Sequence, residues 1–153
     1  MTPDHIRTVQ ATWTRVLPVK DAAAQIFCEC LRQDAPLLAC LLRGDLRQRG
    51  AKFIQVIDVA VDGLGQRSCS APLMRMLGRR YADCAVTDTH YDSIANALLG
   101  MLDWCLGPEF TPDVKVAWET VYLELVAIMR EAALATLPAK TFRVQQPDLR
   151  NAP

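Results

Sequence analysis

Apolar residues recur at intervals of three and four along most of the chain, which is the spacing of amphipathic helices. Seven segments follow this pattern, over about residues 3–17, 20–33, 36–43, 45–63, 70–82, 88–106 and 112–137. No segment alternates convincingly between apolar and polar residues, as a half-buried strand would. The pattern therefore predicts an all-α domain.

Capping residues mark several ends of these segments. Thr2 and Thr111 each precede a proline and are expected to cap the first and last helices, because proline suits the first helical turn. Asp88 or Thr89 is expected to cap the helix that follows "AVTDT", and Gly107 is expected to end it.

Two stretches lack the helical period. The segment "GLGQRSCSAP", residues 63–72, is rich in glycine and serine and predicts a loop, with Ser70 and Pro72 opening the next helix. After Pro138 the chain loses its apolar stripe and gains proline and amide residues. We therefore expect one domain over residues 1–138 and a flexible C-terminal tail over residues 139–153.

Length and charge narrow the classes of protein. A chain of 153 residues with 51% hydrophobic content is long enough to bury one substantial core. Seventeen basic residues balance seventeen acidic ones, so nucleic acid is not an expected partner. The sequence has neither a secretory signal pattern nor an apolar stretch long enough to span a bilayer, which predicts a cytoplasmic protein without a membrane partner.

The six cysteines do not form a metal or disulfide pattern. They fall mostly inside apolar helical stripes, and no CxxC pair occurs. We expect reduced, structural thiols and no zinc site.

One long block resembles a known family. The stretch "MLGRRYADCAVTDTHYDSIANALLGMLDWCLGPEFTPDVKVAWETVY", together with "LLRGDLRQRGAKF", is similar to bacterial single-domain globins and to the haem domain of flavohaemoglobins. The likeness extends over roughly residues 2–135. It implies a globin fold of seven to eight helices around a central pocket for haem b. It also implies a small diatomic or anionic ligand, and it is compatible with a homodimer formed through the long helices.

The resemblance implies an unusual proximal residue. In this family a histidine on the helix before the "HY" pair binds the iron, and counting back from His90 and Tyr91 places Tyr81 at that position. Tyr91 is expected to face the proximal side of the pocket.

The same comparison implies four residues on the distal side. Cys28 falls where a tyrosine usually contacts bound oxygen, and Leu42 falls where a phenylalanine usually wedges against the porphyrin. Arg49 replaces a distal glutamine or histidine, and Phe53 takes a flanking apolar position. The family's pattern is thus altered at several haem-contact positions together.

A phenolate ligand predicts different chemistry from an imidazole. It is a hard, anionic oxygen donor that favours ferric iron, so Tyr81 as metal ligand would suit ferric redox, nitrogen-oxide or peroxide chemistry or sensing rather than oxygen storage. His5 is expected to be solvated, and His90 to have a supporting or surface role. Cys84 and Cys28 stay open as thiolate donors.

Two other hypotheses stay open beside the haem protein. Tyr81 is also an ordinary type of core residue, so the chain could be a haem-free globin-shaped regulatory or interaction module. The pocket could instead take another apolar ligand.

Overall fold

The computed structural model describes residues 1–36, 45–82 and 87–136, and these residues are almost entirely helical. The α-helices are α1 (Pro3–Val16), α2 (Lys20–Asp34), α4 (Leu46–Asp62), α5 (Arg67–Ala82), α6 (Asp88–Leu106) and α7 (Pro112–Thr136). Short 3-10 turns cover Leu17–Val19, Gly63–Gly65 and Gly107–Glu109. The described ranges contain no strand, which confirms the all-α prediction. The helix expected over 36–43 and the tail expected over 139–153 lie outside them, apart from Pro36.

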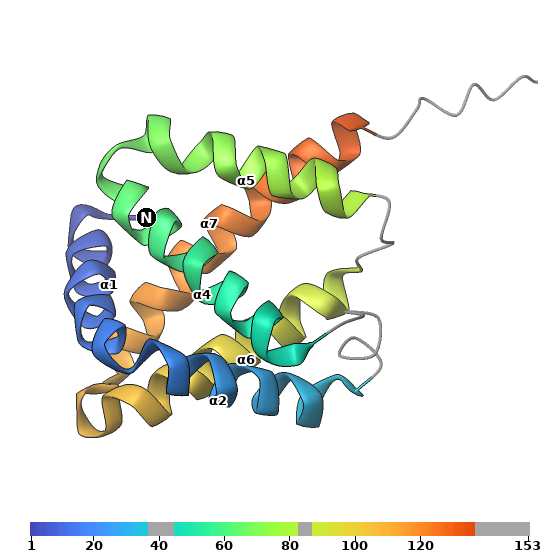
Figure 1. The fold of residues 1–153 in the computed structure, drawn as a ribbon. Helices are drawn as coiled ribbons and strands as arrows, with labels where there is room; N and C mark the ends of the chain where they lie inside the picture. The colour runs from blue at the N-terminus through green and yellow to red at the C-terminus, as the bar shows by residue number, and fades with distance from the viewer. Residues whose placement is uncertain (37–44, 83–86, 137–153) are drawn as a thin grey trace, which may run out of the picture.

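The helices pack in pairs that are distant in sequence. Figure 1 shows α7 passing behind α4 through the middle of the molecule, with α5 crossing α7 near its C-terminal end. The most extensive packing joins α5 to α7, α2 to both α6 and α4, and α1 to α7. Among the described helices, none is long and apolar enough to cross a membrane.

The predicted caps of the first and last helices are confirmed. The Thr2 hydroxyl accepts a hydrogen bond from the His5 amide at 3.2 Å, and the Thr111 hydroxyl accepts one from the Val114 amide at 3.4 Å. Each bond satisfies an amide that has no partner within the first helical turn. Gly107 ends α6 with a φ of 53°, a conformation that favours glycine.

Two helix starts differ from the predictions. The N-cap of α6 is Thr87, and Asp88 and Thr89 already lie inside the helix. The Thr87 amide donates a hydrogen bond to Nδ1 of His90 at 3.0 Å. Helix α5 begins at Arg67 rather than at Ser70, so Pro72 lies inside it. The glycines form only the short turn Gly63–Gly65, and Pro72 costs α5 one amide donor close to its start.

Two tryptophans join α1 to the centre of the core. The rings of Trp13 and Trp118 lie 5.7 Å apart and are tilted by 57°, an arrangement typical of stable aromatic pairs. Nε1 of Trp13 donates to Oδ1 of Asp58 at 2.8 Å, and Nε1 of Trp118 donates to Oγ1 of Thr12 at 3.0 Å. The buried indole groups therefore keep partners, and they tie α1 to both α4 and α7.

Candidate functional site

The proximal candidate lies near the end of α5. Met74 and Leu77 of this helix are 3% and 8% exposed, so their stripe is the buried face of α5. Tyr81 follows Met74 by seven residues and Leu77 by four, which is the register of the same face. The backbone at Tyr81 is helical, one residue before the end of α5, and its side chain lies outside the described part of the structure.

Helix α5 is in backbone contact with α7. A Cβ atom added at Gly78 would lie 2.2 Å from the carbonyl oxygen of Met129 and 2.9 Å from its Cα. Only a residue without a side chain fits at this crossing. Gly78 thus brings α5 closer to α7 than any other residue would allow, three residues before Tyr81.

Helix α7 also holds the start of α6. The Tyr122 hydroxyl donates a hydrogen bond to the backbone carbonyl of Tyr91 at 2.8 Å, and Arg130 forms an ion pair with Asp88 at 2.6 Å. Tyr91 is buried, and its burial raises the pKa of its phenol. Tyr91 thus lies on a helix that is fixed to the same support as α5.

The distal candidates lie where α2 meets α4. The Gly50 amide forms a hydrogen bond with the Cys28 thiol, although burial has the larger effect and raises the pKa of that thiol. The Phe53 ring is stacked on the Phe27 ring, with centroids 3.9 Å apart and planes 7° apart. Arg49 is exposed. The structure therefore brings Cys28 and Phe53 to the same pair of helices.

Arg49 and Leu42 are the other two residues predicted for the distal side. Because Arg49 is exposed, its guanidinium keeps access to water and needs no buried counter-ion. Leu42 lies outside the described residues.

Two small cavities lie among the described helices. One, of about 200 Å³, is lined by Gln25, Cys28, Glu29, Arg32 and Arg47 between α2 and α4. The other, of about 280 Å³, lies between α6 and α7 and is lined in part by Asn96, Trp118 and Leu123. Both are smaller than the ~300–1,000 Å³ of typical ligand sites, so neither is the expected haem pocket.

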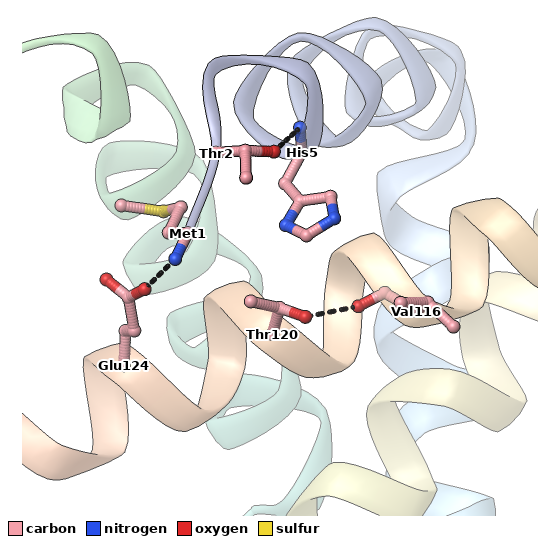
Figure 2. A network of polar contacts seen from close by, with 6 residues as sticks. All are labelled: Met1, Thr2, His5, Val116, Thr120 and Glu124. Atoms are coloured by element: carbon pink, nitrogen blue, oxygen red, sulfur yellow. Dashed lines mark hydrogen bonds and ion pairs between the residues drawn. The ribbon is translucent and has the colours of Figure 1, made fainter.

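The two histidines of the chain lie on helices other than α5, His5 on α1 and His90 on α6. Nδ1 of His90 accepts the Thr87 amide, which makes His90 part of the α6 cap. The expectation that His5 is solvated holds only in part: the residue is half-buried, and its Nδ1 is buried with no hydrogen-bond partner among the described residues. Figure 2 shows its ring over α7, near Thr120, with the ammonium group of Met1 paired to Glu124. This ion pair draws the start of the chain onto α7.

The described cysteines agree with the thiol prediction. Cys28, Cys30 and Cys105 form no disulfide, and burial raises the pKa of each thiol. Cys40 and Cys84 lie outside the described residues, and so does the side chain of Cys69. Within the described part of the chain, no three His, Cys, Asp or Glu side chains are grouped so that they could hold a metal ion.

Comparison with known proteins decides the family. The globin family model matches residues 43–129. The chain belongs to the globin family. It is 31% identical to neuroglobin of Danio rerio over 118 residues, which are 76% of this chain and 73% of that protein. Neuroglobin of Dissostichus mawsoni is 28% identical over 92 residues, covering 60% of this chain and 58% of the relative.

Solved globin structures share the fold at low sequence identity. Haemoglobin from the botfly Gasterophilus intestinalis aligns with a TM-score of 0.78 and 11% identity, covering 88% of this chain and 99% of that chain. A hexacoordinated heme protein from an anhydrobiotic tardigrade aligns with a TM-score of 0.77 and 13% identity, covering 88% and 96%. The predicted globin fold is therefore confirmed. The likeness to bacterial globins and flavohaemoglobins stays a prediction, because the two relatives named above are neuroglobins.

Proposed function

We propose that this globin binds haem b through Tyr81, with the iron held in the ferric state. The observation that carries the proposal is the register of Tyr81, which continues the buried stripe of Met74 and Leu77 on a helix held against α7. The tardigrade neighbour is a heme protein, which supports haem as the occupant of this fold.

The donor set fits a tyrosine ligand. His5 and His90 are the only histidines, and the first packs on α7 while the second caps α6. Burial raises the pKa of both the Tyr91 phenol and the Cys28 thiol, so each favours its neutral form, which is a poor ligand for ferric iron. Tyr81 lies on α5, at the position where the family carries its proximal ligand.

The ligand determines which chemistry the protein supports. Bound haem would supply an iron that Tyr81 keeps ferric, because a hard anionic oxygen donor stabilises the higher charge. Ferric iron binds oxygen poorly, and it suits redox, nitrogen-oxide or peroxide chemistry or sensing. The exposed Arg49 supplies a cation for an anionic partner, either a haem propionate or a small anionic ligand. Cys28 and Phe53 would contribute a thiol and an aromatic ring to the distal side.

The direct test is a haem titration of three proteins. The wild type should bind one haem per chain and show the visible charge-transfer absorption of an iron phenolate. Tyr81→Phe should lose that absorption, whereas Tyr91→Phe should keep it, which separates the two candidate tyrosines. A wild type that does not bind haem saturably contradicts the proposal, and favours a haem-free module or a pocket for another apolar ligand. If Tyr81→Phe binds haem as well as the wild type does and with the same spectrum, the ligand is another residue, and Cys84, Cys28 and His90 are tested next.

A homodimer is the second part of the proposal. Three large apolar side chains are exposed on α7, namely Val116, Leu123 and Leu134. Their spacing of seven and eleven residues places them on one side of the helix, where a second copy could cover them. Analytical ultracentrifugation should detect a dimer that Leu123→Glu weakens. A monomer at every concentration would contradict this part alone.

A further inference from the structure

We infer that α7 positions the Tyr81 ligand, chiefly through the backbone contact between Gly78 and Met129, which makes Gly78 a positioning residue. The inference rests on the proposed haem ligation by Tyr81 and extends it. It concerns residues that do not themselves touch the haem iron.

The contact at Gly78 leaves no room for adjustment. The three atoms closest to an added Cβ are the carbonyl oxygen, carbonyl carbon and Cα of Met129, at 2.2, 2.9 and 2.9 Å. All three belong to the backbone of a helix, so they cannot rotate away as the end of a side chain could. Reaching even the 3.4 Å at which ordinary contact begins requires the oxygen and the new Cβ to separate by about 1.2 Å.

A movement of this size reaches Tyr81. Three residues of α-helix span about 4.5 Å, so Tyr81 lies less than one turn beyond the contact. Met74 and Leu77 are buried on the same helix, which makes a local bend at Gly78 costly, and α5 should therefore move as a unit. The backbone of Tyr81 moves with it.

Helix α6, which is attached to α7, does not move with α5. The start of α6 is held to α7 by the Tyr122 hydrogen bond to the Tyr91 carbonyl, and the exposed ion pair of Arg130 with Asp88 adds a weak contact. Moving α5 away from α7 therefore changes the position of Tyr81 relative to Tyr91 and α6. Both helices beside the proposed ligand therefore pack on one support, the part of α7 from Tyr122 to Arg130.

The chain offers a matched control for the substitution. No atom lies within 4 Å of a Cβ added at Gly65, whose φ does not require glycine. Gly65→Ala adds the same methyl group just before α5, without pressing on another helix. Any effect that is specific to Gly78→Ala can therefore be attributed to the contact with α7.

The experiment compares haem-loaded wild type, Gly78→Ala and Gly65→Ala. Circular dichroism first establishes that each variant is folded. We expect Gly78→Ala to shift or lose the iron–phenolate absorption and to weaken haem binding by about 10–100-fold, the usual effect of disturbing a group that orients a metal ligand. Gly65→Ala should match the wild type. A folded Gly78→Ala with the wild-type absorption and affinity would overturn the inference.

Failure of the proposed function gives a different result. If the wild type itself lacks the iron–phenolate absorption, the ligand proposal fails before any glycine is changed. If the wild type and both alanine variants share that absorption, only the role of Gly78 fails.

A second variant covers the case in which Gly78→Ala does not fold. Tyr122→Phe removes the hydrogen bond to the Tyr91 carbonyl and leaves the α5 contact in place. The inference predicts a smaller shift of the same absorption in this variant. An unchanged spectrum would then overturn the role of α7.

Discussion

Replacing Gly50 by alanine tests how closely α2 and α4 pack beside the distal candidates. An added Cβ would lie 2.7 Å from Sγ of Cys28 and 2.8 Å from the carbonyl oxygen of Ala24. The Cys28 side chain can rotate, but the Ala24 carbonyl belongs to the backbone of α2. The two helices must therefore separate, and the contact between them loosens.

The size of the effect follows from two opposing contributions. Alanine is preferred over glycine inside a helix by about 0.5–1 kcal/mol, which favours the variant. Overpacking a tight contact costs about 1–3 kcal/mol, which opposes it. We expect a net loss of about 1–2 kcal/mol in the free energy of unfolding.

Gly100→Ala is the matched control, because it places alanine in α6 against a side chain. The nearest atom to its added Cβ is Sγ of Cys30 at 3.2 Å, and no backbone atom of another helix appears among the contacts within 4 Å. A small rotation of Cys30 relieves this contact. We expect stability unchanged or raised by up to about 1 kcal/mol.

Urea unfolding followed by far-UV circular dichroism measures both variants. With a denaturant slope of about 1–3 kcal/mol per M, Gly50→Ala should lower the midpoint by roughly 0.5–1 M. A Gly50→Ala protein as stable as the wild type would refute the packing argument. So would a Gly100→Ala protein that loses as much stability as Gly50→Ala.

Three further outcomes are expected. Tyr122→Phe should lower the free energy of unfolding by about 1–3 kcal/mol, because the Tyr91 carbonyl loses its hydrogen bond. Thr120→Ala should lower it less, because the Thr120 hydroxyl bonds within its own helix. Equal losses in urea unfolding would contradict this. Leu98→Ala should cost about 2–5 kcal/mol in the same assay, since Leu98 is almost fully buried, and a loss below that of Thr120→Ala would count against the core packing. Thiol counting should find all six cysteines reduced. The described thiols should react slowly at neutral pH, and because their folded pKa values are raised, the free energy of unfolding should fall as the pH rises above 9.0.

The sequence predicts the start of a helix well where the capping hydrogen bond joins residues that are close together in the chain. Thr2 and Thr111 act on amides three residues away, so their roles could be predicted from a few letters. The start of α6 was harder, because His90 replaces the glutamate or glutamine that usually accepts the N-cap amide. The start of α5 differs because Pro72 is typical of a first helical turn, whereas this helix already begins at Arg67 and holds Pro72 inside it.

The candidate site was predictable only in part. The register of Tyr81 can be counted along one helix, and the resemblance supplied the position of the ligand. The contact between Gly78 and Met129 joins residues that are far apart in the chain, and nothing near either residue indicates it. The partial burial of His5 on α7 is equally hidden from the local sequence, as is the pairing of Met1 with Glu124, which spans 123 positions.

Resonance Raman spectroscopy of the haem-loaded ferric protein tests the central claim most directly. Protein made with ring-deuterated tyrosine and excited in the charge-transfer band should show phenolate modes that shift with the label. These modes should be present in Tyr91→Phe and absent in Tyr81→Phe. Haem-loaded wild type without label-sensitive modes, or the same modes persisting in Tyr81→Phe, would contradict ligation by Tyr81.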